Sequence, residues 1–91
     1  MVAFPGGFGT MDELFEALTL IQTHRMQPIP VVLFGRDYWS RLIDWDMFVE
    51  EGTISPEDVQ LVRYAESAQE CWQIIDDFHA AQPAEKLPRG Q

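Results

Sequence analysis

Apolar residues in the first third of the chain change from a continuous run to a helical period and back. Residues 1–4 are all apolar and end at a glycine-rich stretch, which is typical of a short buried strand. Over residues 11–24 the apolar positions recur three and four apart, which predicts an amphipathic helix. Pro28 and Pro30 exclude its continuation. The apolar run 31–34 that follows predicts a strand covered on both faces.

The rest of the chain continues this alternation with less regular segments. Aromatic and aliphatic side chains, N-cap residues and a short apolar run define its elements. We predict a helix over 37–50 interrupted near Trp45, a short helix after Ser55, a strand over 61–65 and a helix that begins after Ser67 and runs to about Phe78.

The order of these elements predicts the fold class. Strands that alternate with helices pair in parallel through right-handed crossovers. We therefore expect an α/β fold, a partial Rossmann-like doubly wound sheet of about three strands and three to four helices over residues 1–81, with 82–91 as a flexible tail.

Few helices are available to cover such a sheet. A parallel sheet needs both faces covered and its edges protected. We expect a truncated domain that lacks an amino-terminal half, or a chain that completes itself as a homo-oligomer. Its three tryptophans, Trp39, Trp45 and Trp72, are predicted to be core or interface anchors.

The composition limits the partners. The 91 residues include 6 Lys and Arg against 15 Asp and Glu, a formal net charge of −9. Nucleic acids and anionic membranes are bound largely through positive side chains, so we expect neither as a partner. The one cysteine, Cys71, can form no internal disulfide, and no apolar run reaches the length of about 18 residues that a membrane helix needs. We expect a cytoplasmic protein, with Cys71 on a helix face rather than acting as a nucleophile.

The candidate chemistry lies in the glycine-rich stretch between the first strand and the first helix. Ligands of open α/β sheets bind at the carboxyl ends of the strands. Gly6, Gly7 and Gly9 let backbone N–H groups approach an anion, and Thr10 adds a hydroxyl at the start of the helix. A phosphate site is one interpretation. The other is a capping box, in which Thr10 and Glu13 satisfy each other's backbone N–H groups, and the spacing alone favours it.

The nine residues Pro5-Gly6-Gly7-Phe8-Gly9-Thr10-Met11-Asp12-Glu13 resemble the P-G-G-x-G-T-x-x-E motif of the LOG (Lonely Guy) family, formerly described as lysine decarboxylase-like. The resemblance extends to about Phe78. It implies hydrolysis of the N-glycosidic bond of purine nucleoside 5′-monophosphates such as AMP, with a cytokinin as the base in some members. By position, Gly6, Gly7, Gly9 and Thr10 would hold the 5′-phosphate and Glu13 would be the catalytic carboxylate. No cofactor is implied, and we expect no metal because no His or Cys partners have ligand spacing.

The chain departs from that family upstream of the motif. LOG proteins carry an earlier half with an arginine that works with the motif's glutamate, whereas only four residues precede the motif here. None of the arginines of this chain at 25, 36, 41 and 63 takes its place. We therefore expect impaired catalysis. The alternatives are a noncatalytic nucleotide- or phosphate-binding or oligomerisation module, and an interaction fragment whose loop only caps a helix.

Overall fold

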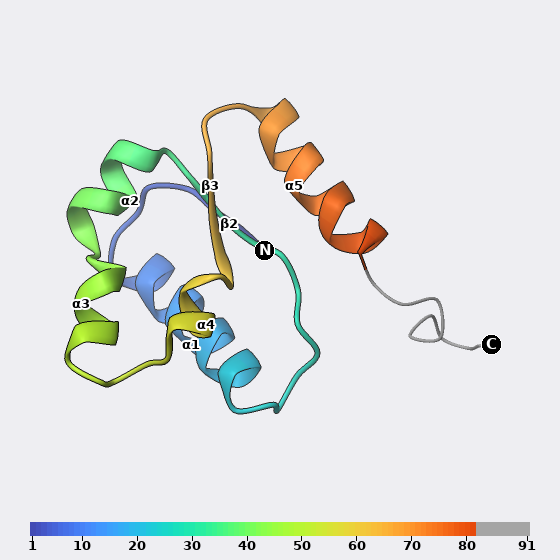
Figure 1. The fold of residues 1–91 in the computed structure, drawn as a ribbon. Helices are drawn as coiled ribbons and strands as arrows, with labels where there is room; N and C mark the ends of the chain where they lie inside the picture. The colour runs from blue at the N-terminus through green and yellow to red at the C-terminus, as the bar shows by residue number, and fades with distance from the viewer. Residues whose placement is uncertain (82–91) are drawn as a thin grey trace.

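The protein is described by a computed structural model, which covers residues 1–81 of the chain (Figure 1). Its elements follow one another as strand, helix, strand, three helices, strand and helix. They are β1 (Val2–Ala3), α1 (Phe8–Gln22), β2 (Val31–Phe34), α2 (Arg36–Leu42), α3 (Trp45–Glu50), α4 (Pro56–Val59), β3 (Val62–Ala65) and α5 (Ala68–Ala80).

The three strands form one parallel sheet in the order β1-β2-β3. Val2 pairs with Val32, and Val31 pairs with Val62. Both crossovers step the same way across the sheet, so the helices within them lie on one face, while α5 covers the other (Figure 1). This arrangement confirms the predicted α/β class and the partial Rossmann-like sheet.

Alternate residues of β2 enter two separate cores. Leu33 packs with Leu14 of α1 and Trp39 of α2, all fully buried, on the face that carries α1 to α4. Val32 packs with Cys71 of α5 on the opposite face. Because both faces of β2 are covered, its sequence is apolar throughout, as the hydrophobic pattern predicted. Cys71 lies on the inner face of its helix, as expected.

The interruption predicted near Trp45 is confirmed as a break between α2 and α3. Ile43 has an extended backbone, with φ −126° and ψ 123°. The Asp44 carboxylate then accepts a hydrogen bond from the Met47 N–H and caps α3. The split brings the helices among residues 1–81 to five, where three to four were expected.

The two predicted serine caps are also present. Ser55 forms a capping box with Asp58 at the start of α4, and the Ser67 hydroxyl accepts the N–H of Glu70 at the start of α5. Trp39 is a core anchor, as predicted, whereas Trp72 on α5 is 65% exposed. Within residues 1–81 no helix combines the length and apolar character needed to cross a membrane. The tail predicted for 82–91 lies outside the described residues.

Candidate functional site

The helix that follows the glycine-rich loop begins earlier than the sequence predicted. Its first residue is Phe8, rather than Met11, and its N-cap is Gly7. Thr10 therefore lies inside the first turn and Glu13 in the second. The capping box between Thr10 and Glu13 is absent, because no side chain caps this end of α1. The capping-box interpretation of the loop is thus wrong for this structure.

The early start leaves backbone donors free at the loop. Gly7 contributes its carbonyl oxygen, which accepts the Met11 N–H at 3.1 Å. The N–H groups of Phe8, Gly9 and Thr10 precede the first intrahelical bond, and no backbone bond from them occurs within residues 1–81. Three N–H groups and the positive end of a 15-residue helix therefore point out of one turn. This arrangement can bind an anion such as phosphate.

The three glycines of the motif differ in what surrounds them. A Cβ on Gly6 would lie 2.2 Å from Thr10 Oγ1 and 2.9 Å from Thr10 Cβ, so the close packing of the loop on α1 requires glycine there. A Cβ on Gly7 or Gly9 would have nothing within 4 Å. Packing within the fold therefore explains why residue 6 is glycine. Packing does not explain Gly7 and Gly9, which leave open space beside the free N–H groups.

Tyr38 of α2 and Gly35, which connects β2 to α2, both contact the loop. The Tyr38 hydroxyl donates a hydrogen bond of 2.6 Å to the Gly6 carbonyl oxygen. A Cβ on Gly35 would lie 3.6 Å from Pro5 Cγ, which places Gly35 directly beside Pro5. Sequence reasoning missed Tyr38, because it lies 32 residues from Gly6 and no spacing rule connects the two.

Glu13 lies on the same flank of α1 as the loop. Residues three and four apart on a helix are neighbours, so Glu13 shares its flank with Thr10 and Gly9. Phe15 lies on the other flank, where its ring is 6.3 Å from that of Trp45 in α3. Because α3 lies toward β3 and α1 connects β1 to β2, the exposed Glu13 faces the side of β1 that carries no strand within residues 1–81.

Among residues 1–81, no ion pair joins a basic side chain to Glu13. The ion pair found within residues 1–81 joins Arg41 to Asp37, at 3.6 Å along α2. The Arg36 guanidinium lies over the Tyr64 ring, 4.7 Å from its centre. The groups that could bind an anion at this loop are therefore backbone donors and the Thr10 hydroxyl, and the exposed Glu13 is the acid one turn further along α1.

A cavity of about 190 Å³ lies elsewhere, between α1, α3 and α4. Its walls include Leu18 and Phe48, and Asp58 lies at it. The Ser55 backbone N–H and the Gln22 side-chain amide both bond the Asp58 carboxylate, and they hold its pKa below the ordinary value. The polar groups at this cavity are therefore hydrogen-bonded to one another.

Comparison with known proteins finds a matching family and several related sequences. A family described as "Possible lysine decarboxylase" matches residues 1–75. The probable cytokinin riboside 5′-monophosphate phosphoribohydrolase LOGL3 of Oryza sativa subsp. japonica is 37% identical over 79 residues, which are 85% of this chain and 37% of the relative. The cytokinin riboside 5′-monophosphate phosphoribohydrolases LOG1 and LOG3 of Arabidopsis thaliana are 37% and 35% identical over the same share of this chain, and the matches cover 37% and 36% of their lengths.

The chain therefore spans little more than a third of the length of these curated relatives. The family match nevertheless covers most of the chain and includes the whole glycine loop and α1. On these grounds the chain belongs to the LOG family, whose sequence model carries the lysine decarboxylase description.

Proposed function

We propose that this chain supplies the phosphate loop and the carboxylate of a phosphoribohydrolase that cleaves the N-glycosidic bond of purine nucleoside 5′-monophosphates, such as AMP or a cytokinin nucleotide. The observation that carries the proposal is the uncapped first turn of α1, with free N–H groups at Phe8, Gly9 and Thr10 beside open space at Gly7. The names of the relatives support the substrate class.

The geometry suggests how the substrate would lie. A 5′-phosphate bound at the first turn of α1 directs the attached ribose along the flank toward Glu13, one turn further on. Cleavage breaks the bond between C1′ and the base nitrogen, water adds its oxygen to C1′, and a proton passes to the base. A carboxylate beside the sugar stabilises the oxocarbenium-like transition state and accepts the proton of the attacking water. We assign that role to Glu13.

We also propose that the site is completed at the open side of β1, by further residues of the family domain or by another copy of this chain. Helical spacing places Glu13 toward that side. On the face of the sheet that carries α5, the side chains of Val2 and Phe4 are 36% and 59% exposed. Trp72 on α5 is exposed as well. Apolar side chains left uncovered in this way favour association. Sedimentation at micromolar concentration tests self-association, and a monomer throughout would leave only the first alternative.

The enzymatic proposal is tested by incubating the chain with AMP and measuring free adenine. Glu13→Gln removes the charge at similar size, and we expect adenine release to fall by about 100-fold or more, the usual effect of losing a general base. Glu16→Gln is the matched control, because Glu16 is an exposed acid one turn further along α1. Equal release by the wild type and Glu13→Gln would remove the enzymatic role of this chain.

A noncatalytic phosphate- or nucleotide-binding module is the second candidate. Two observations favour it: Glu13 is exposed, and the two arginines of α2 contact Asp37 and Tyr64. Calorimetry with inorganic phosphate and AMP separates the two candidates, because the module would bind both without releasing adenine. Gly7→Val serves as the binding control, since a Cβ there has nothing within 4 Å in the fold and would stand beside the free N–H groups. Unchanged affinity in Gly7→Val would refute the loop as the binding site.

We finally propose a cytoplasmic location. The support is the single cysteine, Cys71, which is unpaired and buried on the inner face of α5 and therefore gains nothing from an oxidising compartment. Fractionation of cells that express the chain tests this.

A further inference from the structure

We propose that Tyr38 is a positioning residue of the phosphate loop, which acts by fixing the orientation of the peptide between Gly6 and Gly7. The inference rests on the proposed function. Its starting point is the bond of 2.6 Å from the Tyr38 hydroxyl to the Gly6 carbonyl oxygen, which joins α2 to a loop far away in sequence.

Tyr38 is well placed for this role because its neighbour is rigidly held. Trp39 is fully buried, and its indole N–H donates to the Phe34 carbonyl oxygen at 3.1 Å. Gly35 turns the chain from β2 into α2 with φ +99°, and its N–H bonds to the Ala65 carbonyl oxygen of β3 at 2.9 Å. The Tyr38 ring packs edge-on against Trp39, with 5.4 Å between ring centres. The hydroxyl is thus fixed relative to the sheet.

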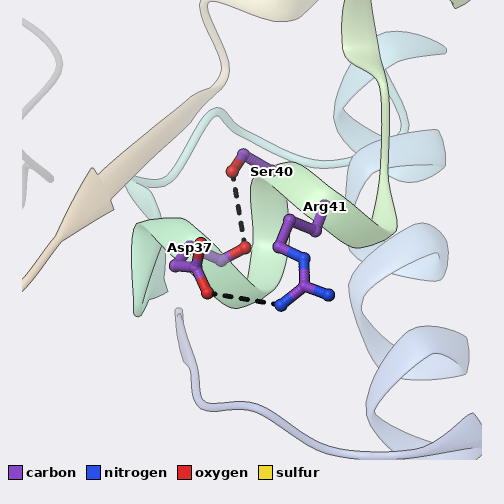
Figure 2. Close-up of polar contacts among 3 residues, drawn as sticks. All are labelled: Asp37, Ser40 and Arg41. Atoms are coloured by element: carbon purple, nitrogen blue, oxygen red, sulfur yellow. Dashed lines mark hydrogen bonds and ion pairs between the residues drawn. The ribbon is translucent and has the colours of Figure 1, made fainter.

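The polar contacts within α2 contribute less to this rigidity. Figure 2 shows the ion pair between Asp37 and Arg41 and the bond from the Ser40 hydroxyl to the Asp37 carbonyl oxygen. The Asp37 and Arg41 side chains are 87% and 79% exposed, so water screens their attraction. The buried indole of Trp39 is what holds α2, and through it Tyr38, in place.

The hydrogen bond to the Gly6 carbonyl oxygen also determines where the Gly7 N–H points. All peptides of residues 1–81 are trans, and in a trans peptide the carbonyl oxygen and the N–H point in opposite directions. Because the Gly6 carbonyl points to Tyr38, the Gly7 N–H points away from α2. Two glycines flank this peptide, so its dihedral angles are otherwise weakly restricted. Without Tyr38 the peptide can turn over and present a carbonyl oxygen, which repels anions, where the N–H now stands.

Tyr38→Phe tests the inference, because it removes the hydroxyl and keeps the ring. We expect the affinity for inorganic phosphate, measured by calorimetry, to fall about 3- to 10-fold, the range of one net hydrogen bond. We also expect faster exchange or a shifted resonance of the Gly7 amide in nuclear magnetic resonance. Tyr64→Phe is the matched control: its hydroxyl makes no hydrogen bond found within residues 1–81, and both observables should match the wild type.

The outcomes separate this inference from the proposed function. If the wild type binds phosphate and Tyr38→Phe binds it equally well, the positioning role is overturned while the phosphate site stands. If the wild type binds neither phosphate nor AMP, the proposed function fails, and an unchanged Gly7 amide in Tyr38→Phe overturns the orientation of the peptide as well. If the thermal midpoint alone changes, with affinity and amide unchanged, Tyr38 is a structural residue only and the inference is wrong.

Discussion

Replacing Gly6 by alanine tests the packing of the loop on α1 directly. The added Cβ would lie 2.2 Å from Thr10 Oγ1 and 2.9 Å from Thr10 Cβ. A change in the Thr10 rotamer can move the hydroxyl but leaves the Cβ contact in place, so the loop has to move away from the helix. Overpacking of this kind costs about 1–3 kcal/mol. We therefore expect Gly6→Ala to destabilise the fold by about 2 kcal/mol.

Urea unfolding followed by circular dichroism measures this loss. With a slope of about 1 kcal/mol/M, the midpoint should fall by about 2 M. Gly9→Ala is the matched control: it adds the same methyl group within α1, meets nothing within 4 Å, and should raise stability by about 0.5–1 kcal/mol through helix propensity. A second variant, Gly6→Ala with Thr10→Ala, removes the closer contact and should recover part of the loss. Equal midpoints for Gly6→Ala and the wild type would refute the close packing.

Three further predictions follow from single contacts. Gly35→Ala places a side chain at φ +99° and should lower stability by about 1–2 kcal/mol in the same urea assay, whereas a neutral effect would contradict the left-handed turn. Trp39→Ala leaves a cavity in the larger core and should lower the free energy of unfolding by about 3–5 kcal/mol. A much smaller loss would show that Trp39 does not anchor α2. The lowered pKa of Asp58 means that its charged form stabilises the fold above the unfolded pKa of 3.8, and that this contribution is lost as the pH falls through the lower folded value. The difference between the urea midpoints of the wild type and Asp58→Ala should therefore be largest at pH 7 and shrink as the pH is lowered below the unfolded pKa. A constant difference would show that the charge is not involved.

Most of the fold follows from patterns that act over short distances in sequence. The β2 run is apolar because both faces are covered, and Ser55 and Ser67 cap helices through neighbours three residues away. Such rules need no tertiary information. The expected order of elements is accordingly confirmed.

The start of α1 could not be fixed in this way. Glycine and threonine are similarly suitable at an N-cap, so residue type does not distinguish Gly7 from Thr10. The choice depends on how the loop packs, and the contact between Gly6 and Thr10 requires Thr10 to be within the helix. The bond from Tyr38 is equally invisible to spacing rules, because the fold alone brings α2 beside the loop.

The flanks of α1 explain why the loop and Glu13 face an open side of the molecule. One face of the helix packs into the core through Leu14 and Ile21. A second flank packs against α3 through Phe15. Glu13 can therefore only point to the remaining flank, beyond β1, together with Gly9 and Thr10. A ligand held by the loop would contact whatever covers β1 in the assembled protein, so a covering chain should tighten the binding of AMP more than that of inorganic phosphate. Equal effects on the two ligands would place the base and ribose away from β1.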